Sequence, residues 1–286
     1  MAAGIRRLGL MTRTYAITGS RTGIGATTAA LLRAAGHRVI GVSRSGDVAA
    51  DLGTPEGRAA AVEAVVDLAG GRLDAVIACA AGGSSAAAEV SIGYFGAVNF
   101  LEALRPVLAR SEAPRVVVVT SMSVMAPNDV ELVTRLRAGD EPSARARADV
   151  LEADPATCGL VEPSVKRALA RWMRAASVSP AWAGVGIAVN AVGPGVVLTE
   201  ATLPLLATPE SVAHVDAMVP MPLGYHASPE AIAHTLIWLA AAENTHCAGQ
   251  NLFVDGGCDV VFRGEDIWSW ADEKVARYRA ETVPDS

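Results

Sequence analysis

Residues 14–32 read TYAITGSRTGIGATTAALL, and this segment decides the fold. The apolar run TYAIT is typical of a buried strand, and ATTAALL has the spacing of an amphipathic helix. Between them, Gly19, Gly23 and Gly25 lie where a missing Cβ lets backbone N–H groups and the helix N-terminus approach a pyrophosphate. We interpret the segment as a dinucleotide-binding turn rather than a merely tight turn, because a second apolar run follows at residue 38.

Short apolar runs alternate with helical patterns along the rest of the chain, as a parallel sheet covered on both faces requires. Helical spacing is clear at 25–36 and 229–243, and Gly36 is a stop signal. The other predicted strands are 38–42, 74–80, 115–120, 186–192 and 250–255. We therefore expect an α/β fold, a Rossmann-like doubly wound parallel sheet in a single domain.

The domain is expected to cover residues 12–262, because no repeat or linker divides this stretch. Residues 1–11 are interpreted as a disordered leader, with Met11 as the start of translation. Residues 263–286 form a C-terminal tail in this division, and Trp268 and Trp270 in it are expected to lie over a neighbouring subunit.

The composition of the 286-residue chain excludes several classes of partner. Its formal net charge is −6 and it has no basic stripe, so nucleic acid and anionic lipid are not expected to bind. No apolar run approaches the length of a membrane span. The four cysteines lack C-x-x-C spacing and are interpreted as reduced, mostly buried thiols of a cytoplasmic protein. The five histidines lack metal-ligand spacing, so no metal site is expected.

The chain resembles the short-chain dehydrogenase/reductase superfamily over residues 12–262. The residues that carry the resemblance are Thr18-Gly19-x-x-x-Gly23-Ile24-Gly25, Asp51-Leu52, Ser121, Lys166, Pro194-Gly195 with Thr199, and VDGG at 254–257. Within the superfamily the chain is similar to the bacterial 3α-hydroxysteroid dehydrogenase/carbonyl reductase and coniferyl alcohol dehydrogenase branch. That branch shares GHRVIGV at 36–42, YFGA at 94–97 and a long insert before the active-site helix.

The resemblance implies a nicotinamide cofactor. NAD-binding relatives carry an acid at the position of Ser43, whereas here a hydroxyl is followed by the Arg44 guanidinium. We expect NADP(H) to bind more tightly than NAD(H), with Arg21 as a second cation for the 2′-phosphate. The expected cofactor-binding residues are Gly19, Ser20, Arg21, Thr22, Gly23, Ile24, Gly25, Ser43, Arg44, Asp51, Leu52, Ala80, Lys166, Pro194, Gly195, Val197 and Thr199.

Two catalytic positions of the family differ in this chain. Relatives carry a tyrosine four residues before the lysine, where this sequence has Glu162 before Lys166. The frame set by Gly96, Ala103 and Pro106 places Gly93 at the position of the family's catalytic asparagine. Asn99 lies six residues further along and is interpreted as structural, as is Ser123.

The expected catalytic residues are therefore Ser121, Glu162 and Lys166. Without the resemblance, Glu162 and Lys166 would be interpreted as an ordinary solvated pair on a helix surface, and Ser121 as a cap at the end of a strand. The alignment with the family favours catalytic roles for all three. A glutamate ordinarily titrates near about 4.3, and the helix N-terminus favours negative charge, so we expect an ionised Glu162.

An ionised carboxylate suits ordinary ketone reduction poorly, because it holds no proton to donate. It suits a base, or a group that binds a cation such as an iminium. We therefore expect an atypical nicotinamide-dependent oxidoreductase. The alternative is a non-redox member that catalyses cyclisation, elimination or isomerisation, and a weaker one is a catalytically silent ligand-binding homologue.

Two further segments bear on the site. The insert at 126–159 is predicted to form two charged helices, beginning with an Asn128 cap and Glu131, with a stop at Gly139. By resemblance the insert obstructs one of the usual subunit contacts, so we expect a homodimer rather than a tetramer.

The loop at 200–225 is rich in Leu, Val, Met and Pro and predicts an apolar substrate. Tyr225 and His226 end this loop and are interpreted as a turn after Gly224, with proton donation as the alternative.

Overall fold

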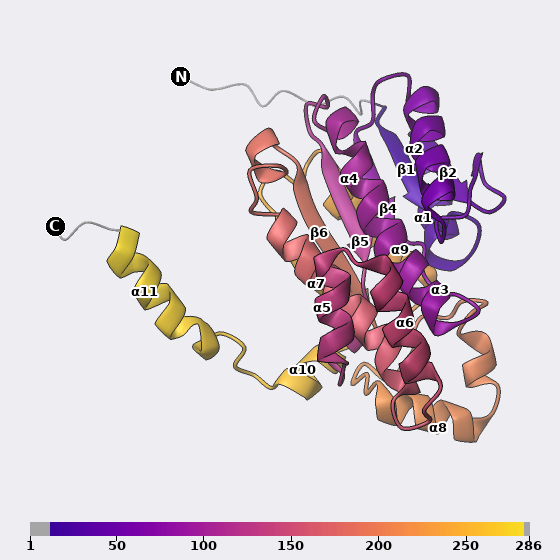
Figure 1. Ribbon diagram of the computed structural model, residues 1–286, viewed down its shortest axis with the longest axis vertical. Helices are drawn as coiled ribbons and strands as arrows, with labels where there is room; N and C mark the ends of the chain where they lie inside the picture. Colours follow the sequence, from indigo (N-terminus) through magenta and orange to yellow (C-terminus); the bar gives the residue numbers. More distant parts are fainter. Residues whose placement is uncertain (1–11, 283–286) are drawn as a thin grey trace.

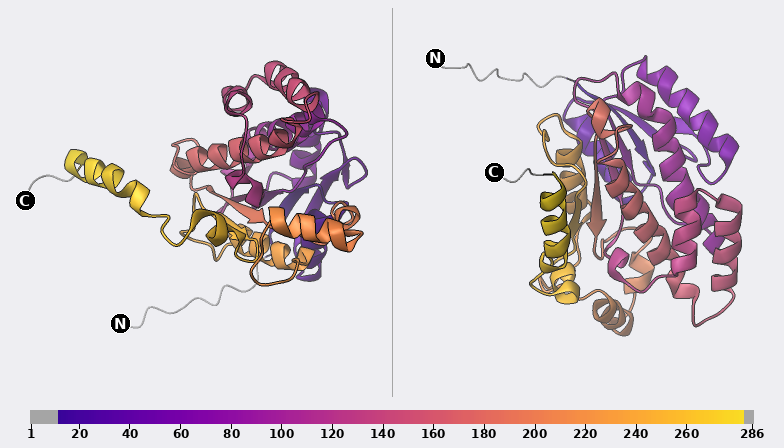
Figure 2. Two further views of the ribbon diagram at one scale, coloured as in Figure 1. Left: turned by 90° about the horizontal axis from the view of Figure 1, so that it is seen from below. Right: turned by 60° about the vertical axis from the view of Figure 1, so that its left-hand side comes forward.

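The computed structural model describes residues 12–282 as one seven-stranded parallel sheet with helices on both faces (Figures 1 and 2). The strands lie in the order β3-β2-β1-β4-β5-β6-β7. Their bounds are Thr14–Thr18 (β1), Arg38–Ser43 (β2), Val48–Ala49 (β3), Ala75–Ala78 (β4), Arg115–Val119 (β5), Ala188–Pro194 (β6) and Asn251–Val254 (β7). The chain runs outward from β1 to β3 and then crosses back to β4, so the expected doubly wound α/β fold is confirmed.

Alternate residues of the central strands pack into two separate hydrophobic cores, one on each face of the sheet. Tyr15 and Ile17 of β1 face the helices α1 (Gly23–Ala34) and α9 (Pro229–Ala240), which pack against each other. Ala16 faces the opposite layer. That layer is formed by α2 (Pro55–Ala69), α4 (Gly96–Leu108) and α7 (Val161–Ala176). Burial on both faces explains why the strands are continuous apolar runs rather than alternating ones.

The helix that leads into α4 contains one turn of π-helix. Residues 86–108 are helical without a break, as α3 (Ala86–Val90), a turn of π-helix (η1, Ser91–Phe95) and α4. π-Helical turns inside α-helices are frequent at functional sites. Gly93, which the sequence analysis predicts at the position of the family's asparagine, lies in this turn.

The insert forms the two predicted helices, α5 (Val130–Ala138) and α6 (Glu141–Glu152). The predicted Asn128 cap is wrong: Asp129 caps α5, and its Oδ1 accepts from the Leu132 N–H at 2.6 Å. Asn128 instead donates to the Ala126 carbonyl. Gly139 ends α5 in the left-handed conformation, φ +77°, as expected. α6 packs on α3 and α5 packs on α7, so the insert lies against the helix that leads into the turn with Gly93 and against the helix that carries Glu162.

The loop at 200–225 contains a short 3₁₀ turn (η5, Leu203–Leu206) and a helix, α8 (Pro209–Met218). Beyond β7 the chain continues through α10 (Cys258–Arg263) and η6 (Ser269–Ala271) to α11 (Asp272–Thr282). α11 stands away from the body that contains the sheet (Figures 1 and 2). The expected leader at 1–11 and the end of the tail, 283–286, lie outside the described residues.

All six predicted strands are confirmed, each within two residues at either end. The two-residue β3 was not predicted, α1 begins and ends two residues earlier than expected, and α9 ends at Ala240 rather than residue 243. The four cysteines are free: Cys258 is buried, Cys79 and Cys247 are partly buried, and Cys158 is exposed, which contradicts the expectation for Cys158. Within residues 12–282, no helix combines the length and apolar character needed to cross a membrane.

Candidate active site

The glycine-rich turn between β1 and α1 depends on missing side chains. Gly19 and Gly23 adopt positive φ angles, +66° and +54°. A Cβ on Gly25 would lie 2.3 Å from the Gly19 carbonyl oxygen. Thr22, the residue before α1, makes no side-chain hydrogen bond that caps the helix. The first N–H groups of α1 therefore remain available to an anion, as in a pyrophosphate site.

The turn is anchored to the end of the neighbouring strand β4. The Thr18 hydroxyl accepts hydrogen bonds from the N–H groups of Cys79 and Ala80, both at 3.1 Å. A Cβ on Gly19 would lie 2.9 Å from the Ala80 nitrogen, so the two backbones touch. The carboxyl ends of β1 and β4 are thereby locked together at the point where the strand order reverses, which is where open α/β sheets bind ligands.

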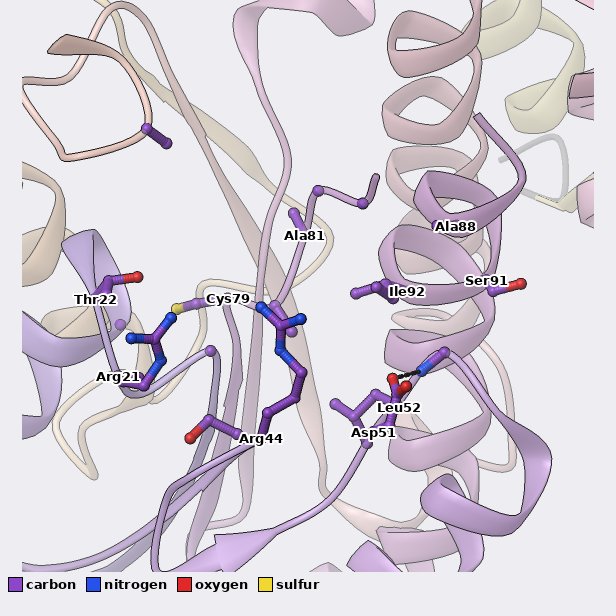
Figure 3. Close-up of a pocket in the computed structure, with 18 of the residues that line it drawn as sticks. Arg21, Thr22, Arg44, Asp51, Leu52, Cys79, Ala81, Ala88, Ser91 and Ile92 are labelled. Atoms are coloured by element: carbon purple, nitrogen blue, oxygen red, sulfur yellow. Dashed lines mark hydrogen bonds between the residues drawn. The ribbon is translucent and has the colours of Figure 1, made fainter. Parts of the chain in front are cut away.

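A pocket of about 760 Å³ opens at this point (Figure 3). Its walls come from the glycine turn, the ends of β2 and β4, the segment at 50–54, the α3 and η1 region, and residues 199–201. The expected cofactor residues among them are Gly19, Arg21, Thr22, Gly23, Ile24, Gly25, Ser43, Arg44, Asp51, Leu52, Ala80 and Thr199. The insert contributes Arg145, which sequence reasoning did not single out.

The remaining expected cofactor residues lie outside the lining of this pocket. Ser20 faces β2, with its Oγ 2.6 Å from where a Cβ on Gly41 would lie. Pro194 ends β6, and Val197 is buried in a bridge with Ala227. A Cβ on Gly195 would lie 2.9 Å from the Asp255 Cα, so the two backbones are in contact.

Two arginines give the pocket a positive wall. The Arg44 guanidinium projects into the pocket, and Arg21 lies on the side of the glycine turn (Figure 3). Within residues 12–282, neither side chain has a hydrogen-bond or ion-pair partner. Asp51 is engaged locally, since its Oδ1 accepts from the Gly53 N–H at 2.8 Å. The open helix terminus, the glycine cradle and the unpaired guanidiniums together fit a dinucleotide with phosphate groups.

The expected catalytic residues lie at the same carboxyl edge, beyond this pocket. Ser121 follows β5 and its Oγ accepts from the Ser123 N–H at 3.1 Å, so the side chain caps the short helix η2 (Met122–Met125). The Ser121 hydroxyl proton remains available to a ligand. The Ser123 hydroxyl, in contrast, is buried without a partner. η2 packs on α7, the helix that carries Glu162 and Lys166.

Glu162 and Lys166 have opposite surroundings. Glu162 is exposed in the first turn of α7, where the helix dipole favours a negative charge. Lys166, one turn later, is only 6% exposed. No hydrogen bond or ion pair joins these two side chains, or joins either of them to Ser121, in the described part of the chain. Glu162 and Lys166 are thus not an ordinary solvated pair on a helix surface, because the ammonium points into the protein.

Two other side chains interact electrostatically with the Lys166 ammonium. Burial raises the pKa of the Cys79 thiol to about 12, although Lys166 lowers it, so Cys79 is a neutral thiol at neutral pH. Burial also raises the pKa of Glu89, with Lys166 lowering it and Glu162 raising it. Sequence reasoning missed Glu89. The available signal was its position four residues before Gly93, which places both residues on one helix face.

Of the histidines at the loop, His226 is held by Asp216, with Nε2 and Oδ1 2.8 Å apart. Tyr225 follows the turn at Gly224, φ +78°, and is 67% exposed. Among the described residues, no group of three or more His, Cys, Asp or Glu side chains is arranged to bind a metal ion.

Sequence comparison places this arrangement in a known family. The chain is 33% identical over 253 residues to a 3-alpha-hydroxysteroid dehydrogenase/carbonyl reductase of Comamonas testosteroni. The matched region covers 86% of this chain and 96% of that relative. The chain belongs to the short-chain dehydrogenase/reductase superfamily. Its members named here are dehydrogenases and reductases, so the chain belongs to an oxidoreductase family.

Two family profiles match parts of the chain, and solved structures of dehydrogenases share its fold. Residues 161–259 match the profile described as enoyl-(acyl carrier protein) reductase, and residues 15–144 match that of the NAD-dependent epimerase/dehydratase family. The structure resembles the 3-alpha-hydroxysteroid dehydrogenase from Pseudomonas sp. B-0831 complexed with NADH, with a TM-score of 0.80 and 34% identity. That match covers 89% of this chain and all of the other. The Pseudomonas aeruginosa RhlG/NADP complex shares the fold, with a TM-score of 0.68 and 22% identity over 87% of this chain and 97% of that one.

The glycine turn can be tested directly. We expect Gly25→Ala to weaken NADPH binding more than tenfold, because the new methyl group must open the turn and misplace N–H groups worth about 1.5–3 kcal/mol each toward a charged ligand. Titration calorimetry of the purified variant measures the affinity. Gly159→Ala is the matched control, since a Cβ there meets nothing within 4 Å. Unchanged NADPH affinity in a folded Gly25→Ala variant would contradict the assignment of the turn.

Proposed function

We propose that the protein is an atypical NADP(H)-dependent oxidoreductase that acts on an apolar substrate through a Glu162–Lys166 pair. The observation that carries the proposal is the exposed carboxyl of Glu162, one helical turn before a buried Lys166, at the ligand-binding edge of a dinucleotide-binding sheet. In this proposal Glu162 stands where relatives carry the proton-donating tyrosine, and Gly93 stands where they carry asparagine.

The bound nicotinamide supplies or accepts the hydride. Glu162, as a solvated carboxylate, accepts a proton from the substrate or pairs with a substrate cation. Lys166 holds the nicotinamide ribose, and the Ser121 hydroxyl donates a hydrogen bond to a polar atom of the substrate. Reduction of an iminium suits these groups, because hydride addition to its carbon gives a neutral amine and consumes no proton. Ketone reduction suits them least, because the forming alkoxide needs a proton that a carboxylate does not hold.

An apolar substrate is supported by the loop at 200–225. Leu203, Leu205, Met218 and Leu223 are each more than half exposed there. Exposed apolar side chains gathered on one segment beside a pocket are typical of a ligand-binding surface. The loop begins with Glu200 and Ala201, which line the pocket.

The proposed preference for NADP(H) is supported by the charges around the end of β2. Ser43 offers a hydroxyl and Arg44 an unpaired guanidinium, while the nearby acid, Asp47, is bound by the Arg33 side chain at 2.8 Å and the Gly41 N–H at 2.7 Å. The Asp47 carboxylate is therefore engaged within the protein, and the end of β2 presents a hydroxyl and a guanidinium to the pocket. The Pseudomonas relative with 34% identity is complexed with NADH, so this chain would differ from it.

The cofactor preference has a simple test. Wild-type protein should bind NADPH more tightly than NADH, and Arg44→Ala should lower only the NADPH affinity, by roughly 10- to 100-fold, the value of one charge-assisted hydrogen bond. Fluorescence titration with both nucleotides measures the two affinities. Arg110→Ala is the control, since this exposed arginine lies after α4 and before β5, at the opposite edge of the sheet. Equal wild-type affinities for the two nucleotides would refute the preference.

The role of Glu162 is tested by a conservative exchange. Glu162→Gln should lower turnover by about 10²- to 10⁴-fold, because the amide neither accepts a proton nor pairs with a cation, and should leave NADPH affinity unchanged. NADPH oxidation with a panel of apolar cyclic imines and matched ketones provides the assay. Full activity of Glu162→Gln, or wild-type reduction of the simple ketones at ordinary rates, would show that the proposal is wrong.

A non-redox reaction is the second candidate, and the absence of both the tyrosine and the asparagine side chain at one site favours it. A pocket retained for the cofactor would then hold a substrate for cyclisation, elimination or isomerisation, with Glu162 as the base. The same panel discriminates the two, because product formation without NADPH oxidation identifies the second. Binding without any product would identify a silent ligand-binding homologue.

We further propose a cytoplasmic homodimer. The insert helices pack on α3 and α7, which supports the view that they obstruct one of the family's subunit contacts. Trp268 and Trp270 are 69% and 66% exposed in the tail, which supports a contact with a second subunit. Light scattering should give the mass of two chains, and Trp268→Ala with Trp270→Ala should shift it toward one. A four-chain mass, or recovery of the native protein in a membrane or exported fraction, would contradict this.

A further inference from the structure

The space beside Gly93 is filled by a carboxyl group from the preceding turn of helix. A Cβ on Gly93 would lie 2.7 Å from Glu89 Oε1 and 3.0 Å from Val165 Cγ1. Any side chain at position 93 would therefore meet Glu89 on α3 and the residue before Lys166 on α7. Gly93 and Glu89 form a matched pair: one residue has lost its side chain, and the other places its carboxyl group in the space.

The Glu89 carboxyl is poorly satisfied there. Its Oε1 is buried and has no hydrogen-bond partner, while the backbone of Gly82 donates to the carboxyl group. A buried carboxylate oxygen without a partner is costly, whereas a protonated carboxyl group is much less so. Burial without a partner for Oε1 thus raises the pKa of Glu89, which shifts the group toward its neutral form.

The charges around Glu89 come from one neighbouring helix. Lys166 and Glu162 of α7 both act on it electrostatically. On α6, which packs on α3, Glu152 accepts from the Ala86 N–H at 2.9 Å, and Arg145 donates to Ser91 Oγ at 2.6 Å. Glu89 therefore lies within electrostatic reach of one ammonium and of one other carboxyl group.

We propose that Glu89 is a positioning residue of the active site, whose carboxyl group replaces the missing side chain at position 93 and carries a proton that leaves Lys166 as the counter-charge of Glu162 alone. This inference rests on the proposed role of the Glu162–Lys166 pair. With Glu89 neutral, the carboxylate of Glu162 and the ammonium of Lys166 balance. When Glu89 loses its proton, the three groups have a net charge of −1, and Lys166 is divided between two anions.

The sign of the pH effect follows from the direction of the shift. Burial raises the pKa of Glu89, so the proton is held below that raised value and lost as the pH rises through it. The attraction of Lys166 for Glu162 should weaken over the same pH range, because Lys166 then also attracts the Glu89 anion. The folded state also binds a proton that the unfolded chain has released, so its stability falls as the pH rises from the ordinary glutamate range to the raised value. Both effects should be absent in Glu89→Gln, which is neutral at every pH.

Carbon-13 NMR of protein labelled at the glutamate carboxyl carbons tests the proposal without substrate or cofactor. One carboxyl signal of the wild type should titrate above the ordinary range near about 4.3 and be missing in Glu89→Gln. The same titration should move to lower pH in Glu162→Gln, because the neighbouring negative charge is gone. It should also move lower in Gly93→Asn, because the amide displaces the carboxyl group from its buried position.

Glu63→Gln, an exposed glutamate of α2, is the matched control and should leave the raised titration in place. Thermal unfolding gives a second readout: the wild type should lose stability relative to Glu89→Gln as the pH rises, while the two proteins fold alike below the ordinary range. A raised signal that persists in Glu89→Gln, or that ignores Glu162→Gln, would overturn the proposal. Because no turnover is measured, these results stand or fall separately from the proposed reaction on imines.

Discussion

The contact between the carboxyl ends of β1 and β4 is the constraint on which the rest of the site depends. Thr18 accepts two backbone hydrogen bonds from Cys79 and Ala80, and Gly19 lets the two backbones approach. This contact sets where the glycine turn lies and directs the open N-terminus of α1 into the pocket. The same strand end positions Cys79 against Lys166, so the cofactor half and the catalytic half of the edge are connected through β4.

In the proposed catalytic half, no hydrogen bond joins Ser121, Glu162 and Lys166 in the described part of the chain, so charge is the interaction left between them. A tyrosine is a neutral group that lends a proton, whereas a glutamate at the same position brings a negative charge to a buried lysine. Under the proposed assignments, that exchange cannot be considered alone, because Glu89 adds a second carboxyl group within reach of the same ammonium. The absence of a side chain at Gly93 and the arrangement of Glu89 are then parts of one rearrangement of the site, and the chemistry available to Glu162 depends on whether Glu89 holds a proton.

Much of the fold could be predicted because both faces of the sheet are buried, which turns each strand into a continuous apolar run between turn residues. β3 was missed because two residues carry no periodicity. The cap of α5 was misplaced by one residue because Asn128 and Asp129 are adjacent and are comparably good caps. The glycine turn was predictable from local spacing, and most of its residues line the pocket. Glu89 was missed because its spacing from Gly93 places the two residues on one helix face but does not reveal that α7 approaches there through Val165.

The central claim is that Glu162 acts on the substrate as a carboxylate that binds positive charge or takes a proton. A crystal structure of the protein with NADP⁺ and a cyclic secondary amine, which is cationic at neutral pH, tests it most directly. The account predicts a carboxylate oxygen of Glu162 about 2.7–2.9 Å from the amine nitrogen, with the adjacent carbon facing the nicotinamide. An amine nitrogen bound elsewhere, with Glu162 turned toward solvent, would contradict it.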